Sequence, residues 1–96
     1  MALNLAKRQI SRISATNCVF LQCDIQERFE NVIYKMPMVI KNTERMTRMS
    51  KIFGIPVIAT EQYTKAFGHT FKSIQDEYHE GVKLFEKNGK YHKFIN

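Results

Sequence analysis

Two short apolar runs, each ending in polar residues, stand out in the hydrophobic pattern of the chain. The first covers residues 18–23 and ends at Asp24; the second covers residues 55–60 and runs into "TEQY". Nearly continuous apolar runs of this length are typical of strands buried on both faces of a parallel sheet. Pro56 at the start of the second run is compatible with a strand, because proline is tolerated there. The pattern therefore predicts two buried parallel strands.

Between these runs, residues 36–53 show the period of an α-helix. Apolar residues three and four apart form one stripe, with two small polar residues filling it: Met36, Val39, Ile40, Thr43, Met46, Met49, Ser50 and Phe53. This spacing places them on one face, and we expect the methionines of the stripe to lie in the core. The opposite face is charged and is interpreted as solvated surface. Pro37 suits the first turn, and Gly54 should end the helix.

The pattern weakens after Tyr63. Residues 64–73 are interpreted as a loop hinged at Gly68, and a short helix is expected near residues 71–79. Residues 81–87 are expected to form a third strand. Residues 88–96 are polar and show no clear period, so no element is predicted there.

The two strand ends are the candidate site. A right-handed β-α-β unit places the carboxyl ends of its strands side by side, and ligands bind at such ends in open α/β sheets. A carboxylate at the end of a buried strand is costly without a partner or a task. Asp24 is therefore either a loop-capping acid or a catalytic one.

Length and charge narrow the classes of function. The 96 residues allow at most one small domain, and no apolar run approaches the roughly 20 residues needed to cross a bilayer. The formal net charge is +6, but the bases are scattered along the chain. A small basic nucleic-acid-binding module remains an alternative, although we expect neither nucleic acid nor membrane as partner.

The cysteines and the N-terminal residues indicate the cellular compartment in which the protein is expected. Cys18 and Cys23 are five residues apart and should point to opposite faces of a strand, so we expect no disulfide and a reducing compartment. Both are interpreted as small apolar core residues. Residues 1–16 hold three bases, two serines and no acid. They are interpreted as an exposed basic leader in a cytoplasmic protein, with a mitochondrial transit peptide as the alternative.

Two motifs in order carry a family resemblance. "CDIQERF", a helix, then "GIPVIATEQY" and "FGHT" resemble the isochorismatase-like cysteine hydrolase superfamily, and most of all the eukaryotic isochorismatase domain-containing proteins. The resemblance covers roughly residues 19–87. It implies a three-layer α/β/α fold with a mostly parallel six-stranded sheet, of which this chain would form the N-terminal half. We accordingly divide the chain into a leader (1–16), a partial domain (17–87) and a divergent tail (88–96).

The resemblance also implies a chemistry. The family uses an Asp, a Lys and a Cys: the thiolate attacks a carbonyl or amide carbon, the Asp moves protons, and the Lys lowers the pKa of the thiol. Asp24 matches the aspartate. Lys87 matches the lysine that follows the third strand, with an ordinary surface lysine as the alternative reading.

The same resemblance implies a substrate pocket. Phe29 matches an aromatic residue that lines it, and four polar or aromatic residues should form its rim: Gln26, Glu61, Gln62 and Tyr63. A structural or rim position is expected for Glu61, rather than a second catalytic role. His69 is interpreted as a loop residue. The three histidines have no metal-ligand spacing, so we expect no metal and no cofactor.

The chain also departs from the family. The family nucleophile follows a fourth strand in a second half, and neither Cys18 nor Cys23 matches it. After Lys87 the run "NGKYHKFIN" is unlike the family. We therefore expect the N-terminal portion of a hydrolase domain for an unknown small molecule, inactive by itself. The alternative is a non-catalytic fragment that docks on a full-length homologue, or on itself, through the exposed apolar edge of the first strand.

Overall fold

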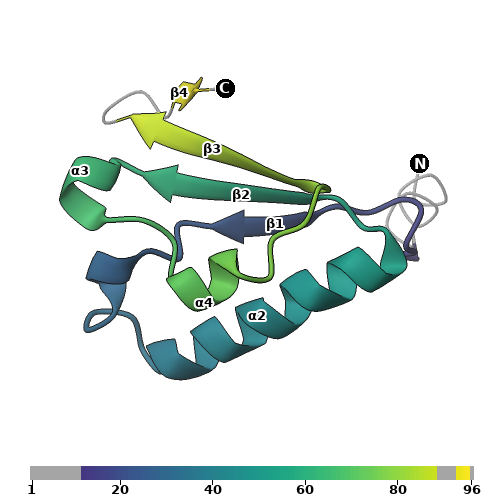
Figure 1. Cartoon of the computed structure of the whole chain (residues 1–96), viewed down its shortest axis with the longest axis horizontal. Helices are drawn as coiled ribbons and strands as arrows, with labels where there is room; N and C mark the ends of the chain where they lie inside the picture. Colours follow the sequence, from purple (N-terminus) through teal and green to yellow (C-terminus); the bar gives the residue numbers. More distant parts are fainter. Residues whose placement is uncertain (1–11, 89–92, 96) are drawn as a thin grey trace, which may run out of the picture.

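The computed structural model describes residues 12–88 and 93–95, which form a four-stranded sheet flanked by helices (Figure 1). The strands are β1 (Phe20–Cys23), β2 (Val57–Gln62), β3 (Val82–Asn88) and β4 (Lys93–Ile95), in the order β1-β2-β3-β4. β1 pairs with β2, and β2 with β3, in parallel, whereas β4 is antiparallel to β3. The predicted α/β fold with a mostly parallel sheet is confirmed.

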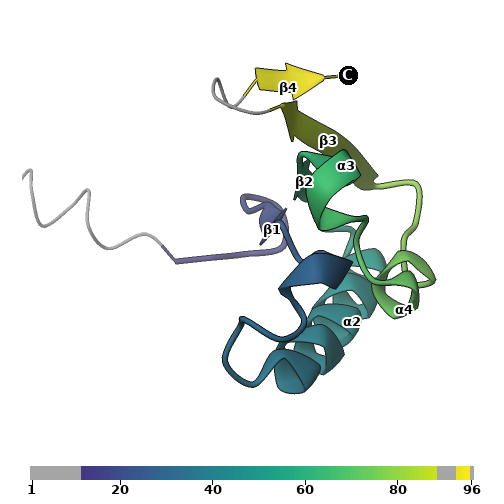
Figure 2. The same cartoon turned by 90° about the vertical axis from the view of Figure 1, so that its left-hand side faces the viewer.

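Helices cover one face of this sheet. They are the 3-10 turn η1 (Glu27–Phe29), α2 (Met36–Phe53), α3 (Thr64–Phe67) and α4 (Lys72–Gln75). Both views place α2 and α4 side by side beneath the strands, with α3 beyond the carboxyl end of β2 (Figures 1 and 2). Within the described ranges no helix covers the other face, which we call the open face. None of the described helices is long and apolar enough to span a membrane.

α2 has the bounds that the periodicity predicts. Pro37 lies in its first turn, and Gly54 ends it in the left-handed conformation with φ 69°. The Gly54 amide donates to the carbonyls of Lys51 and Ser50, so the helix end is satisfied by its own backbone.

The buried stripe of α2 differs from the predicted one. It consists of Met36, Thr43, Thr47 and Ser50, while Met46 and Met49 are each 47% exposed and Phe53 is 56% exposed. Placing Met46 and Met49 in the core was therefore wrong. The three hydroxyls donate to helix carbonyls of Val39, Thr43 and Thr47, which removes the penalty for burying them. Hydrophobic periodicity cannot detect a buried stripe of satisfied hydroxyls.

Several elements differ from the prediction because long-range contacts create them. α3 replaces the expected loop, and its Thr64 hydroxyl donates to the Glu86 carboxylate on β3 at 2.8 Å. α4 covers only part of the helix expected at 71–79. β2 starts two residues later than predicted and extends to Gln62. β4 lies in the tail, where no element was predicted, and forms by pairing with β3.

The cysteines are both free, and Cys23 is exposed. A core role for Cys23 was wrong, because its strand position directs it toward the open face. Cys18 is partly buried. Most of the predicted leader, residues 1–11, lies outside the described residues.

Candidate functional site

Asp24 ends β1 in a left-handed conformation, with φ 53°. Aspartate tolerates this conformation better than most residues, and it turns the chain away from the sheet. The Asp24 amide donates to the Thr60 carbonyl on β2 at 3.0 Å. Asp24, which the sequence pattern placed at the end of a strand, therefore lies in a turn that is hydrogen-bonded to β2 at the carboxyl edge of the sheet.

Lys87 comes to the same point from β3. Its Nζ lies 2.6 Å from Asp24 Oδ2, across 63 residues of sequence. The two side chains are largely but not fully buried, with 15% of Lys87 and 22% of Asp24 exposed. A charge-assisted contact of this length fixes both groups while leaving them accessible from outside. The structure thus brings together the two residues that the resemblance matched to the family's acid and lysine.

Thr60 is the third member of this cluster, and the sequence analysis did not single it out. Its hydroxyl donates to Asp24 Oδ1 at 2.8 Å, so Thr60 and Lys87 hold one carboxylate oxygen each. In the parallel register Thr60 lies opposite Cys23 on one side and Phe85 on the other. Its place in the "TEQY" strand end was the available signal. A hydroxyl at that strand end, one strand away from an acid, is positioned to bond it.

Gln26 clamps two loops together beside this cluster. Its side chain is fully buried; its Nε2 donates to the carbonyls of Gln62 and Gly68, and its Oε1 accepts from the Gln62 amide. The amide group is thus used at both ends by backbone. These contacts give Gln26 a structural task under the pocket rim for which it was predicted.

Glu61 is also buried and fully engaged. Its Oε2 accepts from the Thr70 amide and hydroxyl, both at 2.7 Å, and its Oε1 lies 3.2 Å from His69 Nδ1. Neighbouring residues of a strand point to opposite faces, so Glu61 points away from the face on which Thr60 meets Asp24. This geometry favours the structural role over a second catalytic acid. His69 lies in the loop expected for it, and its side chain is 67% exposed.

Aromatic residues gather next to the strand ends. Phe29, on η1, lies against Phe67 of α3 with ring centroids 5.0 Å apart, and Phe67 meets the ring edge of Tyr63 at 6.5 Å. Tyr63 is 44% exposed and borders a shallow pocket of about 300 Å³ with Thr64, Lys65 and Glu86. Hydrogen bonds from Thr64 hold the pKa of Glu86 below its usual value. Phe67 belongs to this aromatic cluster, although the sequence pattern did not single it out.

No cysteine thiol in the described part of the chain is hydrogen-bonded to the acid or the lysine. Cys23 is exposed opposite Thr60 in the register, but no hydrogen bond joins its thiol to Asp24 or Lys87. Cys18 lies before β1, at the far end of that strand. Within residues 12–88, no group of three or more His, Cys, Asp or Glu side chains could hold a metal ion.

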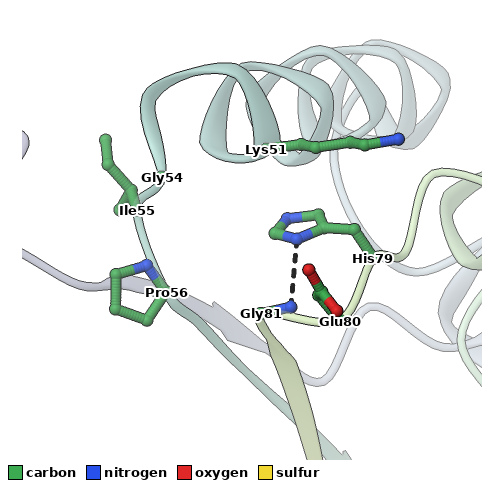
Figure 3. Close-up of a pocket in the computed structure, with 7 residues that line it drawn as sticks. All are labelled: Lys51, Gly54, Ile55, Pro56, His79, Glu80 and Gly81. Atoms are coloured by element: carbon green, nitrogen blue, oxygen red, sulfur yellow. Dashed lines mark hydrogen bonds between the residues drawn. The ribbon is translucent and has the colours of Figure 1, made fainter.

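A second pocket, of about 280 Å³, lies at the opposite ends of β2 and β3 (Figure 3). His79 is at its centre: the Gly81 amide donates to Nδ1 at 3.2 Å, and Nε2 lies 2.9 Å from the Ser50 hydroxyl. Because Nδ1 accepts, Nε2 carries the proton and donates to Ser50. The ring therefore contacts α2 through Nε2 and the residue before β3 through Nδ1, which is a structural role. The candidate site is the Asp24 end of the sheet.

Comparison with known proteins places this arrangement in a family. No protein-family model matches the chain. "Isochorismatase family protein 1B" of Dictyostelium discoideum is 37% identical over 82 residues, which cover 83% of this chain. "Secreted isochorismatase effector Isc1" of Phytophthora sojae is 32% identical over 88 residues, or 90% of this chain. The chain spans 40% and 42% of the lengths of these two proteins.

A solved structure agrees with these sequence relatives. The MAR1 ribonuclease of Caenorhabditis elegans superposes with a TM-score of 0.77 at 36% identity. The match covers 80% of this chain and 40% of that one. The fold described above is therefore one portion of a larger α/β domain in the proteins it resembles.

Proposed function

The chain belongs with the isochorismatase-like proteins, of which it matches an N-terminal portion, and we propose that it supplies the acid–lysine part of a hydrolase site. The observation that carries this proposal is the contact of Lys87 with Asp24 at 2.6 Å, made across the ends of three parallel strands. In this proposal Asp24 is the proton-transferring group, and Lys87 is the cation that stabilises a thiolate. The substrate is a small molecule that enters from the open face.

The two oxygens of the Asp24 carboxylate bond to two different residues, and this arrangement supports the assignment. Thr60 holds Oδ1 and Lys87 holds Oδ2, so the carboxylate cannot rotate, and a fixed geometry is what proton transfer requires. The lysine ammonium, partly exposed on the same side, offers a positive charge to an approaching thiolate. Phe29, Phe67 and Tyr63 supply apolar surface near the strand ends.

We also propose that this chain does not catalyse hydrolysis by itself. The family chemistry needs a thiolate, and Cys23 has no base within hydrogen-bond reach in the described residues. The purified chain should therefore leave isochorismate and p-nitrophenyl acetate unchanged above the buffer rate. Turnover that disappears in the Cys23→Ala variant would instead make Cys23 the nucleophile and overturn the assignment.

A chimera tests the function directly. Residues 17–87 of this chain replace the matching segment of the Phytophthora sojae protein, whose name describes it as an isochorismatase. We expect the chimera to consume isochorismate, followed by liquid chromatography. Lys87→Met should lower this rate at least ten-fold, because the neutral side chain cannot stabilise a thiolate.

Lys83→Met is the matched control for that variant, since Lys83 is an exposed lysine earlier on the same strand. It should retain the rate of the chimera. Equal losses in the two variants would show that Lys87 acts as an ordinary surface lysine. Circular dichroism of each variant separates loss of the site from loss of the fold.

A second candidate is RNA cleavage, favoured by the name of the similar C. elegans ribonuclease and by the formal net charge of +6. The discriminating measurement is cleavage of a single-stranded RNA by the same segment grafted into the C. elegans protein. RNA cleavage that is lost in Lys87→Met, without any isochorismate consumption by the first chimera, would favour the nucleic acid over the small molecule.

A further inference from the structure

An exposed apolar loop joins η1 to α2. Three consecutive apolar residues lie in it, and the exposed fractions are 71% for Val32, 45% for Ile33 and 83% for Tyr34. Both views show this segment as a loop that projects at one end of the helical layer (Figures 1 and 2). Adjacent apolar side chains that face water gain free energy when they enter an apolar environment, so the loop is a candidate contact surface.

Backbone hydrogen bonds hold this loop at both ends. The amides of Val32 and Ile33 donate to the Phe29 carbonyl, at 3.1 and 3.2 Å. Lys35 ends the loop in the left-handed conformation with φ 51°, and its carbonyl accepts from the Met38 amide in the first turn of α2 at 3.0 Å. The apolar side chains are therefore presented by a turn with a defined shape.

The first half of α2 continues this surface. Met38 is 58% exposed, and a shallow hollow of about 360 Å³ lies beside it. The hollow is lined by residues on neighbouring turns of the helix: Pro37, Met38, Lys41, Asn42 and Arg45. Two cations thus lie next to an exposed apolar side chain.

The charge beside the loop is of one sign. Residues 31–43 contain two lysines and no acid, and the flanking acids are Glu30 and Glu44. One of these lysines, Lys35, has its Nζ 5.4 Å from the centroid of the Tyr34 ring, which places a cation against the apolar loop itself. Cations next to exposed apolar side chains complement a partner that has an anionic surface over an apolar interior.

We propose that this loop surface, formed by Val32, Ile33, Tyr34 and Met38 with Lys35, Lys41 and Arg45, docks on an anionic membrane. The apolar side chains enter the boundary between the headgroups and the acyl chains. The Tyr34 ring lies at the level of the headgroups, where an aromatic ring with a polar tip is favoured. The three cations contact the lipid phosphates.

A membrane fits this surface better than an acidic peptide does. The apolar side chains project on a loop, whereas peptides are recognised in grooves or at strand edges. A bilayer accepts a projecting loop without needing a matching cavity. The scatter of bases along the sequence predicted no membrane partner, and the exposed loop beside three of those bases reverses that expectation.

A Tyr34→Trp variant tests whether the loop enters the bilayer. The sequence has no tryptophan, so the new indole reports on this position alone. With vesicles of phosphatidylcholine and about 30% phosphatidylserine, we expect its emission to move to shorter wavelength, because the ring leaves water. Ile52→Trp is the matched control: Ile52 is 72% exposed near the other end of α2, and its variant should show no shift.

Charge reversal tests the cations. In flotation of the 96-residue chain with the same vesicles, Lys41→Glu should weaken binding at least ten-fold, since one base at an anionic surface contributes about five-fold and the new acid is repelled. Lys83→Glu is the matched control, because Lys83 is exposed on β3 and its variant has the same net charge. It should bind within about two-fold of the parent chain.

Several results would overturn the proposal. Absence of binding to the anionic vesicles, or an unshifted emission from Tyr34→Trp, would exclude docking through this loop. Equal losses in Lys41→Glu and Lys83→Glu would show attraction by net charge without a specific surface. An emission shift on addition of the Phytophthora sojae protein, but not of vesicles, would make the loop a contact with a full-length homologue. Circular dichroism of each variant confirms that it remains folded.

Discussion

The Thr60 hydroxyl fixes the direction in which the Asp24 carboxylate faces. It donates to Oδ1 at 2.8 Å, which leaves Oδ2 to Lys87 at 2.6 Å. A hydrogen bond to a charged group contributes about 1.5 kcal/mol or more, so its loss lets the carboxylate rotate out of position.

In the isochorismatase chimera, we therefore expect Thr60→Val to lower kcat about ten-fold with little change in KM. Thr60→Ser keeps the hydroxyl and should restore most of the rate. If valine and serine at this position gave equal rates, the hydroxyl would have no positioning role. A thermal melt of both variants shows whether the fold is retained.

Tyr78 makes the stability of the fold depend on pH in the alkaline range. Burial raises the pKa of Tyr78 above its usual value, although hydrogen bonds from Thr70 and Gln22 oppose the shift. The folded state thus keeps a proton that the unfolded chain loses. This contribution to stability is complete below the unfolded pKa of about 10 and is lost as the pH rises toward the folded one.

Tyr78→Phe should accordingly reduce the fall in melting temperature between about pH 9 and pH 11. The absorbance titration at 295 nm should also lose the tyrosine whose pKa is raised above its usual value. Tyr34→Phe is the control, because Tyr34 is 83% exposed. Identical alkaline profiles for the two variants would show that Tyr78 does not set the limit.

At the scale of elements, Gly54 and Gly68 each end a helix, but they differ in the room that the structure leaves for a side chain. Gly54 ends α2 with φ 69° and has nothing within 4 Å of an added Cβ. Gly68 ends α3 with φ 77°, and a Cβ there would meet Glu27 Oε1 at 2.8 Å. The Gly68 carbonyl also accepts from Gln26. The turn after α3 is therefore built around a glycine, whereas the turn after α2 needs only a left-handed residue.

Gly54→Ala should cost about 1 kcal/mol, the penalty for a left-handed alanine. Gly68→Ala should cost about 2–3 kcal/mol, because φ 77° with ψ −169° is a backbone conformation essentially restricted to glycine, and the new Cβ must also move Glu27. Urea unfolding of the two variants measures the difference. Equal losses would mean that the turn after α3 relaxes to a conformation that alanine adopts.

The helices and strands that the sequence pattern predicted are those that residues close together in the sequence determine. α2 was predicted to its end residues by period, Pro37 and Gly54, and β1 and β2 were located by their apolar runs. α3 and β4 were not predicted, because they depend on bonds to β3 that are distant in sequence. The same holds for Thr60, whose role appears only when β1 and β2 pair in register.

At the scale of the whole molecule, the described residues leave several apolar side chains uncovered, and the chain spans only 40% of the length of the Dictyostelium relative. The open face of the sheet and one flank of α2 carry exposed apolar side chains such as Leu21, Met46 and Phe53. Amphipathic patterning marks such residues as buried but cannot show what buries them. This explains why Met46 and Met49 were predicted in the core and are exposed in this chain.

The proton-transferring role of Asp24 is tested most directly by the rate of isochorismate consumption by the chimera carrying Asp24→Asn. Asparagine preserves the shape but cannot transfer the proton, and loss of a general acid or base costs about 100-fold or more. We expect that loss, with an unchanged rate in the control Asp76→Asn, whose exposed acid pairs with Lys72. A rate within about three-fold of the parent chimera would contradict it, and Asp24 would then be a loop-capping acid.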